Sequence, residues 1–578
     1  MLIYEKHLPI SIKSLRVDLL FLFLFIGAFY LLWMGSYPLF TPDEGRYSEV
    51  AREMIATNDF ITPRLNGVGF FDKPILYYWL QASAISMFGL TEWALRFWPV
   101  LIGIFGCLVT YVAGHLLFNR KTGLIASIIL ALHPMYYGAS HYANLDLEVA
   151  VWISASLLFF IIGIESTSKN RTNFLLLSYF FAALATLTKG LIGIIFPIMI
   201  IGAWILILNR FRILTKMRLF LGLTLFFVIT MPWYYLVQKA NPQFFDFFFV
   251  TQQFSRFLTK ADFNNKTGVW FYIPLVLAGS VPWTIFLFQS LIKNLQLVWQ
   301  NRQKYRVELF LLLWLALIFI FFSIPKSKTI GYILPILPSI AILMGRYFDI
   351  YWNTATQKTV VALMIFCGLM SCSLISLPFI SQFNIDAKFT CPIIFISGML
   401  AFATFVIYFL RKKSLSSIFY CMSLVSFIFL LTLIHSAPLF NEKSSKSLTT
   451  FIKSSLQPTD EIVTWYRYYQ DLPIYLERRI TIVADWHAAD IPQYDNWQRE
   501  LWYNMPYQDT TEWLIEEPAF WERYKSDKRI FIFLQKDMLP HFRDHLQKHA
   551  ENTAYYVGPA SIEHAKLMII SNKPWENN

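Results

Sequence analysis

The residues with the clearest chemical potential are acids that stand in polar connectors beside long apolar stretches. Asp43 and Glu44 are adjacent in TPDEGRYSEVAREM, and Asp146 stands in SHYANLDLEVA, where an apolar stretch begins. A carboxylate at such a place can orient a sugar, stabilise positive charge or act as a general base. Acids also favour helix N-termini, and both roles can coexist. We predict Asp43 and Asp146 as catalytic residues and Glu44 as a substrate-binding residue.

Cations accompany these acids in the same connectors. Arginine binds phosphate through a bidentate fork, and lysine binds it as a point charge. In a membrane protein such side chains also extend to lipid headgroups, which is the alternative interpretation. As a set, the cations predict binding of a lipid-linked phosphate by Arg46, Lys73, Lys189, Arg256, Lys326 and Lys328.

Metal and nucleotide sites have less support in the sequence. Asp72 and His141 could be metal ligands, but no tight spacing of His, Cys and Asp accompanies them. The cofactor is therefore unknown, with a divalent metal at Asp72 as the candidate. A Gly-x-Ser-x-Gly turn and a Gly-rich nucleotide loop are both missing from the sequence, which argues against a serine hydrolase and against ATP-driven pumping.

The composition indicates which elements must position these residues. Hydrophobic residues make up 56% of the 578, which is too apolar for a soluble protein. The net charge of +12 comes mostly from short basic clusters between apolar runs. That pattern is typical of membrane topology and excludes nucleic acid as a partner. The five cysteines lie in or beside apolar stretches, and we expect them to be packing residues.

A helix needs about 20 apolar residues to cross the hydrocarbon layer. That length predicts an α-helical polytopic membrane protein with about thirteen transmembrane helices. The first is expected to be a retained anchor, since it lacks a cleavage site. The spans are expected near 17–36, 94–117, 122–138, 147–165, 173–188, 190–208, 219–236, 271–291, 307–324, 330–346, 359–380, 392–410 and 415–435.

The distribution of Lys and Arg orients these spans. Every second short connector is rich in them, and the alternate ones hold few, so the rich set faces the cytoplasm. The N-terminus is then cytoplasmic, and an odd number of spans places the tail outside. The long connectors 37–92 and 237–270 fall on the outer side. We expect surface-lying helices in both connectors, and the predicted acids and cations to share one extracytoplasmic pocket.

The tail differs from the rest of the chain. EIVTWYRY, RITIVAD and RIFIFL have the character of strands, and EEPAFWERYKS and MLPHFRDHLQKHA that of helices. This alternation predicts a small α/β domain that buries its own core. We therefore divide the chain into a transmembrane domain at 1–439 and a periplasmic α/β domain at 440–578.

Several motifs in chain order resemble those of a known enzyme family. They are PDEGRYSEVAREM, NGVGFFDKPILYYW, YANLDLE, LTKG, SRF followed by WFYIP, and SIPKSKTIGYILP. Together they resemble the lipid A aminoarabinose transferases, which are membrane glycosyltransferases of the GT-C type related to protein O-mannosyltransferases. The tail sequence YRYYQDLPIYLERRITIV is similar to the periplasmic domain of that family.

The resemblance implies an enzyme of the bacterial inner membrane with thirteen spans. It would move 4-amino-4-deoxy-L-arabinose from undecaprenyl phosphate to a lipid A phosphate, with inversion at the anomeric carbon. By position, Asp43 matches the family's first-loop aspartate and Asp146 its second acid. Lys73 matches the lysine of a Glu-Lys-Pro motif, Arg256 the arginine of an Arg-Phe motif, and Tyr332 a tyrosine before Ile-Leu, which adds Tyr332 to the substrate-binding residues.

The sequence also departs from the family pattern. Asp72 replaces the glutamate of Glu-Lys-Pro, and Gln252 and Gln253 stand where the lipid A enzymes have Glu-His. Thr329 and Ile330 replace a Leu-Pro after the lysine pair. The loss of a carboxylate and an imidazole removes two potential metal ligands, and it leaves the metal and the acceptor open.

Two alternatives remain beside the main interpretation. One is a polyprenyl-phosphate-sugar transferase that acts on a hydroxyl of protein or of another envelope glycan. The other is a non-enzymatic flippase for lipid-linked sugars, which is less favoured because few acids lie within the spans. The expected partners are the undecaprenyl-phosphate-linked donor, a lipid A or other envelope acceptor, and membrane lipids. We expect the chain to be a monomer.

Overall fold

The computed structural model describes residues 12–166, 169–255, 267–354, 357–380, 386–494, 496–551, 553–558 and 566–574. The chain forms two compact units. Unit 1 comprises residues 1–34, 96–230 and 268–436, and unit 2 comprises 35–95, 231–267 and 437–578. The long connectors thus group with the tail by contact. The predicted boundary at 439/440 remains a prediction.

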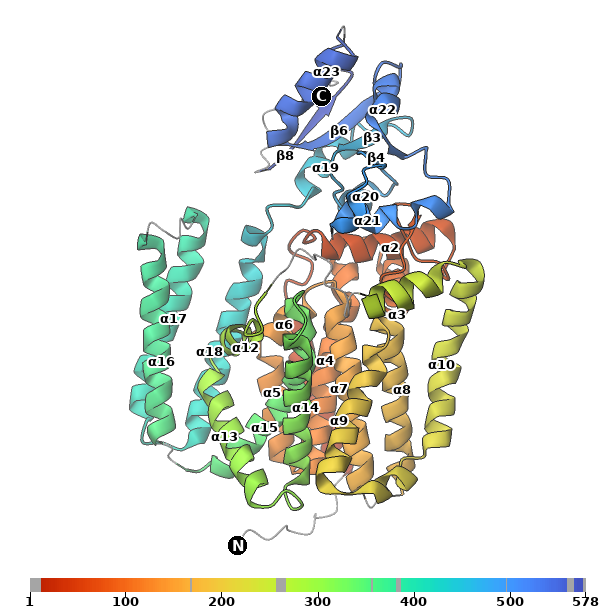
Figure 1. Ribbon diagram of the computed structural model, residues 1–578. Coiled ribbons are helices and arrows are strands. Elements are labelled where there is room, and N and C mark those ends of the chain that lie inside the picture. Colours follow the sequence, from red (N-terminus) through yellow and green to blue (C-terminus); the bar gives the residue numbers. More distant parts are fainter. Residues whose placement is uncertain are drawn as a thin grey trace. The chain divides into compact units, whose positions relative to one another are not determined.

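Unit 1 is built from long helices, because its apolar runs have the length of a membrane crossing. In Figure 1 these helices lie side by side, for example α7 with α8 and α16 with α17. The helices are α1 (Ile12–Leu31), α4 (Glu92–Leu117, whose first turn belongs to unit 2), α5 (Arg120–Ala131), α6 (Pro134–Ser140), α7 (Leu145–Glu165), α8 (Arg171–Lys189), α9 (Ile192–Leu208), α10 (Leu219–Ala240, whose last part belongs to unit 2), α12 (Tyr272–Gly279), α13 (Thr284–Gln300), α14 (Arg306–Ser323), α15 (Leu337–Tyr351), α16 (Gln357–Ser376), α17 (Thr390–Leu410) and α18 (Leu415–His435), with short helical turns η1 (Phe211–Lys216), η3 (Ile330–Ile336), η4 (Leu377–Phe379) and η6 (Ala387–Phe389).

Each of the thirteen predicted spans coincides with a helix or a helix pair. Within the described residues, nine helices are long and apolar enough to cross a membrane, and up to eleven if two bent pairs count as one span each. The two other predicted spans are α9, an apolar helix of 17 residues, and α8, which carries a cation at each end. The polytopic helical fold class is confirmed.

Proline accounts for the place of both bends. Pro134 begins α6 directly after α5, and the two helices meet at 64°. Pro282 stands between α12 and α13, which meet at 113°. A proline has no N–H for the preceding turn and disfavours helical geometry in the residue before it, so a continuous helix ends there.

The connector at 37–92 folds within unit 2 as two helices and a hairpin. The expected helices are confirmed as α2 (Asp43–Thr57) and α3 (Leu76–Phe88). Between them, β1 (Arg64–Leu65) pairs antiparallel with β2 (Val68–Gly69). The turn is Asn66-Gly67, with φ of 49° and 83°, the left-handed pair that a tight hairpin requires. The second long connector contains η2 (Asp246–Ser255), a π-helical stretch.

The tail contains a six-stranded mixed sheet, which confirms the predicted α/β region. The strand order is β5-β4-β3-β6-β8-β7, with β5, β4, β3 and β6 parallel and β8 antiparallel to β6 and β7. The elements are η7 (Ala437–Phe440), α19 (Lys446–Lys453), β3 (Glu461–Trp465), α20 (Leu472–Leu476), β4 (Thr481–Val483), η8 (Ile491–Gln493), α21 (Trp497–Trp502), η9 (Met505–Tyr507), β5 (Leu514–Ile515), α22 (Glu517–Tyr524), β6 (Ile530–Gln535), η10 (Lys536–Met538), α23 (Leu539–His549), β7 (Tyr556–Val557) and β8 (Leu567–Ser571).

The core of this sheet region explains why α22 and α23 are held firmly. Phe520 and Trp521 of α22 and Phe542 of α23 belong to one buried cluster with Val463 and Ile532 of the central strands. Fully burying such side chains stabilises by roughly 1.5–3 kcal/mol each. The two helices therefore have fixed positions on the sheet.

Candidate functional site

Burial separates the two adjacent acids at the start of α2. Glu44 is fully buried, and its Oε2 accepts the Phe40 N–H at 2.7 Å. The side chain of Asp43 is 37% exposed, and its Oδ1 lies 3.3 Å from Nη2 of Arg46. Both acids favour the positive end of the helix dipole. Glu44 thus has a structural contact, whereas Asp43 faces outward; both predicted site roles stay predictions.

Arg46 joins α2 to the tail within unit 2. Its Nη1 lies 2.6 Å from Oε1 of Glu500, a residue of α21. Burial alone would lower the pKa of Arg46, but the carboxylates of Glu500 and Asp43 hold it above its ordinary value. Gly45 allows α2 to pack closely against the tail, because a Cβ at this position would lie 2.6 Å from the backbone nitrogen of Asp471.

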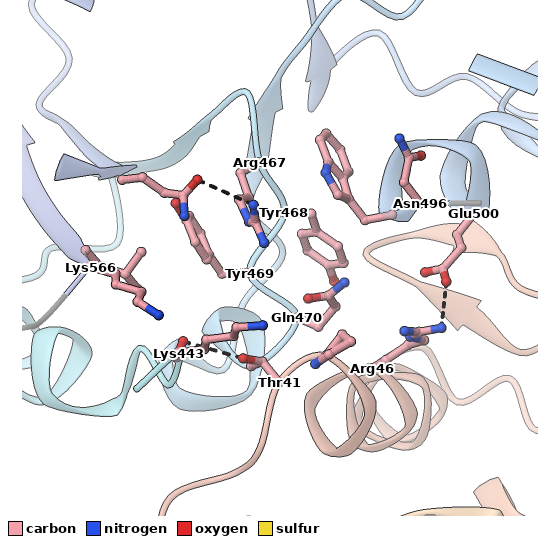
Figure 2. A pocket seen from close by; sticks show the side chains of 14 residues that line it. Thr41, Arg46, Lys443, Arg467, Tyr468, Tyr469, Gln470, Asn496, Glu500 and Lys566 are labelled. Atoms are coloured by element: carbon pink, nitrogen blue, oxygen red, sulfur yellow. Dashed lines mark hydrogen bonds and ion pairs between the residues drawn. The ribbon is translucent and has the colours of Figure 1, made fainter. Parts of the chain in front are cut away.

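A pocket of about 280 Å³ opens beside Arg46 (Figure 2). Its lining combines four cations with a single carboxylate, that of Glu500, together with aromatic rings. Such a lining suits an anion that also has an apolar or sugar surface. Sequence reasoning identified only Arg46 of this group, because the other members come from separate parts of the tail: Lys443, Arg467, Lys566, Tyr468, Tyr469 and Trp497.

Asp72 and Lys73 precede α3. The ammonium of Lys73 donates to the Asp72 carbonyl at 3.1 Å, and both side chains are half-buried. Burial raises the pKa of Tyr78, and the charge of Asp72 raises it further. The same charge adds to those of Glu500 and Asp43 in raising the pKa of Arg46. These predicted site residues of unit 2 are therefore electrostatically linked.

In unit 1 the structure brings three predicted site residues together. The ammonium of Lys189, the last residue of α8, pairs with the Asp146 carboxylate in the first turn of α7. It also lies 4.3 Å from the centroid of the Tyr332 ring in η3. Asn144 caps α7 by accepting the Asp146 N–H at 2.9 Å, which fixes the direction of the helix start. The result is an acid, a cation and a phenol at the ends of three helical segments.

Gly331 and Gly190 permit this arrangement. A Cβ on Gly331 would lie 2.0 Å from Asp146 Oδ2, so any other residue would displace the carboxylate. Gly190 ends α8 with a φ of 84°, a conformation that favours glycine. The nearby acid Glu148 points elsewhere, because its Oε1 accepts from Thr188 at 3.0 Å and from Trp152 at 3.2 Å.

The remaining predicted cations differ in exposure. Lys328 is buried, and desolvation lowers its pKa, whereas Lys326 is exposed. Arg256 lies outside the described residues. Gln252 and Gln253 lie within the π-helical stretch η2.

Both ring nitrogens of His141, which was suggested as a metal ligand, face backbone carbonyl groups. Its Nδ1 lies 2.9 Å from the carbonyl oxygen of Tyr137, and its Nε2 lies 2.8 Å from that of Tyr30. A neutral imidazole has one N–H and can donate to one of these carbonyl oxygens, and that hydrogen bond competes with binding of a metal at the same nitrogen. The role of His141 stays a prediction. Asp72 stays a prediction.

A buried network on α2 was not predicted. Arg52 pairs with Glu49 at 2.6 Å, and Glu53 accepts the N–H of Gly67 at 2.7 Å. Burial and the charge of Glu49 raise the pKa of Glu53, Arg52 lowers it in part, and the resulting pKa is about 8. The signal was present as three charges in EVAREM, but only the fold shows that they form a buried network.

Comparison with known proteins adds to this geometry. Residues 72–236 match the family described as dolichyl-phosphate-mannose-protein mannosyltransferase. An undecaprenyl phosphate-alpha-4-amino-4-deoxy-L-arabinose arabinosyl transferase of Aeromonas hydrophila is 33% identical over 324 residues, which cover 56% of this chain and 58% of that protein. A second such transferase, of Proteus mirabilis, is 30% identical over 339 residues, or 58% and 60% of the two chains. The chain thus matches about three fifths of the length of these relatives.

The crystal structure of ArnT from Cupriavidus metallidurans bound to undecaprenyl phosphate has a TM-score of 0.81 with this chain at 23% identity, covering 97% of this chain and 99% of that one. A second structure, ArnT in the apo state, has a TM-score of 0.77. The resemblance that the motifs predicted is confirmed: the chain is similar to undecaprenyl phosphate aminoarabinose transferases over about three fifths of their length, and it has the fold of the ArnT structures.

Proposed function

We propose that this chain is an inverting glycosyltransferase that moves 4-amino-4-deoxy-L-arabinose from undecaprenyl phosphate to a phosphate of lipid A. The observation that carries the proposal is the similarity to arabinosyl transferases at 33% identity. We place the reaction at the periplasmic face of the bacterial inner membrane, with a cytoplasmic N-terminus and a periplasmic tail.

The proposed reaction is a displacement at the anomeric carbon. An oxygen of the acceptor phosphate forms the new bond as the bond to undecaprenyl phosphate breaks, so that the bonding electrons leave with the lipid phosphate. An acceptor phosphate is already an anion and needs no base. We propose that Asp43 orients the sugar or stabilises positive charge at the anomeric carbon.

Charge stabilisation of the leaving phosphate is the task we assign to the cations. Preorganised donors aimed at developing charge are worth about 10²–10³ in rate each. Lys189 suits this role, since Asp146 and the Tyr332 ring fix its ammonium. Lys73, Arg256, Lys326 and Lys328 complete the proposed set.

The cationic pocket of unit 2 supports an anionic acceptor. Arg46 is paired there with Glu500 and Asp43, and Lys566 with Glu442 at 3.1 Å. The charges of Lys443 and Arg467 favour a phosphate-bearing group, and the aromatic rings of the lining suit a sugar face. We propose that lipid A phosphate binds there before transfer. Charge removal at Arg467 should then raise the KM for lipid A without changing that for the donor.

The experiment is mass spectrometry of lipid A from cells with and without this protein. The main proposal predicts an added aminopentose per modified phosphate. The matched control is an Asp43→Asn variant at equal abundance, which should leave lipid A unmodified. Unchanged lipid A in cells that hold both the active protein and the donor would refute the assignment of the acceptor.

A second candidate is transfer to a hydroxyl of protein or of another envelope glycan. The match of residues 72–236 to the protein mannosyltransferase family favours it. A hydroxyl needs a general base, and Asp43 would take that role. Unchanged lipid A together with altered glycoprotein would support this candidate.

A further inference from the structure

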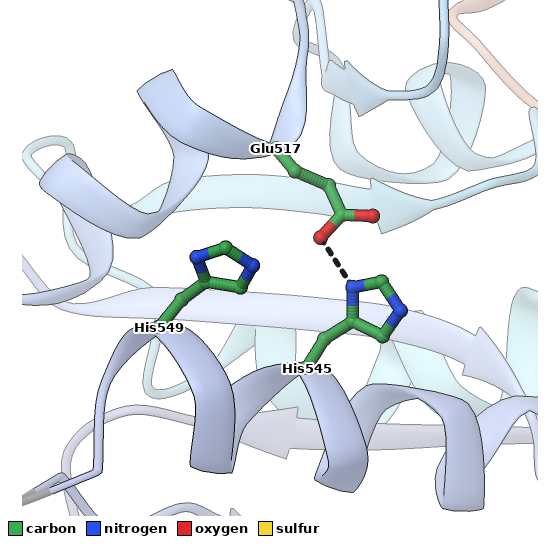
Figure 3. Close-up of side chains that lie close together, drawn as sticks. All are labelled: Glu517, His545 and His549. Carbon is green, nitrogen blue, oxygen red and sulfur yellow. Dashed lines mark hydrogen bonds and ion pairs between the residues drawn. The ribbon is translucent and has the colours of Figure 1, made fainter.

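Three metal-ligating side chains meet in the C-terminal sheet region, and none of them is a predicted site residue or lines the pocket beside Arg46. They are Glu517 at the start of α22 and His545 and His549 on α23 (Figure 3). One ligand atom from each lies within 4.8 Å of the other two. Such a set combines one carboxylate with two imidazoles.

The helix period places the histidines together. His545 and His549 are four residues apart, so they share one face of α23 and are one turn apart along it. Glu517 comes from the facing helix, and the buried contact of Trp521 with Phe542, 5.6 Å between centroids, fixes the two helices. The three ligands are therefore held by a rigid core.

Neighbouring groups hold the Glu517 carboxylate in place and ionised. Oε1 accepts from the Tyr466 hydroxyl, and Oε2 accepts from Trp521 at 3.2 Å and from His545 Nδ1 at 2.6 Å. Burial alone would raise the pKa of Glu517, but these hydrogen bonds hold it below its ordinary value. Supporting contacts of this kind are typical around metal-binding carboxylates.

The imidazoles are also positioned by ring contacts. The ring of His549 stacks on that of Trp521, with 5.9 Å between the ring centroids and an interplanar angle of 12°. That of His545 stacks on His541 at 4.1 Å. The side chain of His545 remains 31% exposed, so an ion can reach it from water.

We propose that Glu517, His545 and His549 form a binding site for a transition-metal ion, with Zn²⁺ as the preferred ion. Two imidazoles favour zinc, copper or nickel over calcium and magnesium, which take oxygen ligands. Bond lengths of about 2.0–2.2 Å place the ligand atoms of a tetrahedral ion roughly 3.3 Å apart. That spacing lies between the 2.6 Å that separates His545 Nδ1 from Glu517 Oε2 and the 4.8 Å that bounds the cluster, so small side-chain rotations can supply it. The fourth position is left to water.

Binding would replace the hydrogen bond between His545 and Glu517 by two bonds to the ion. Protons compete for the imidazoles, so the affinity falls as the solution is acidified. The ion would join α22 to α23 and stabilise the sheet region by mass action. This role is independent of the transfer reaction proposed above.

The test uses the full-length, tag-free protein in detergent, stripped with a chelator and titrated with Zn²⁺ by calorimetry. We expect one equivalent to bind, and His545→Gln and His549→Gln each to weaken it at least tenfold. His487→Gln is the matched control: His487 Nδ1 also faces a glutamate, Glu516, at 2.5 Å, but it stands outside the three-ligand cluster. That variant should bind zinc as the wild type does.

A second measurement stays informative if a variant fails to fold. Co²⁺ bound to the wild type should show the visible absorption of a tetrahedral site, and X-ray absorption should show two imidazoles per ion. Absence of stoichiometric binding, equal affinity in both histidine variants and the wild type, or a site without imidazoles would each overturn the proposal.

Discussion

Replacement of Asp43 by asparagine separates a chemical role from a structural one. The structure predicts a small cost in stability. The side chain is 37% exposed, and its pairing with Arg46 at 3.3 Å is that of a surface salt bridge, worth about 0.2–1 kcal/mol. Loss of the charge at the helix N-terminus costs a further 0.3–1 kcal/mol or so. Arg46 keeps its contact with Glu500 at 2.6 Å. The total is below about 2 kcal/mol.

The expected loss in rate is larger. A carboxylate that acts on the reacting sugar is worth about 10²–10⁴ in rate, and each factor of ten corresponds to about 1.4 kcal/mol of activation free energy. A folding defect of under 2 kcal/mol would leave most molecules folded in a protein of ordinary stability. The rate per folded molecule therefore reports on the chemistry.

The assay is transfer of aminoarabinose from undecaprenyl phosphate to lipid A by purified protein, read by mass spectrometry, with thermal unfolding measured in parallel. The matched control is Asp59→Asn, since Asp59 pairs with Arg64 at 2.6 Å with its side chain 30% exposed. We expect the control to lose stability but to keep its rate. An Asp43→Asn variant with more than about a tenth of the wild-type rate would refute the assigned role.

Three further predictions concern the groups around these acids. Gly331→Ala should displace the Asp146 carboxylate and lower the transfer rate by about 100-fold, which is the loss that a misplacement of about 1 Å can cause. Gly398→Ala is the control and should keep the wild-type rate, because a Cβ at Gly398 meets nothing within 4 Å. Lys189→Met should leave the Asp146 carboxylate without its ammonium partner. Because the two side chains are only 10% and 16% exposed, we expect the free energy of unfolding to fall by up to about 3 kcal/mol and the transfer reaction to be slower. The pKa of Glu53 is raised to about 8, so the folded state holds a proton that the unfolded state releases near pH 4.5. The free energy of unfolding should therefore fall as the pH rises from about 4.5 to 8, and Glu53→Gln should flatten that part of the pH–stability curve.

The sequence predicted what depends on local chemistry. The lengths of the apolar runs predicted the helices, and β-branched and aromatic residues predicted the strands β3, β4 and β6. Contacts between distant residues could not be predicted in this way. Lys189 and Asp146 are 43 positions apart, and only packing of α8 against α7 brings them together. The histidine spacing on α23 was visible in the sequence, but its carboxylate partner comes from another helix.

The neighbouring acids Asp43 and Glu44 show why residue type alone underdetermines function. Successive positions on a helix differ by about 100° in direction, so adjacent side chains in one turn meet different surroundings. Glu44 points inward, is fully buried and accepts a backbone N–H, whereas Asp43 remains partly open to solvent beside Arg46. A buried carboxylate fixed by a backbone donor cannot approach a substrate without leaving that donor unpaired, at a cost of about 1–3 kcal/mol. For Asp43 the known cost is smaller, about 0.2–1 kcal/mol for its surface salt bridge with Arg46. The physical case for catalysis therefore falls on Asp43, and the case for holding the turn falls on Glu44.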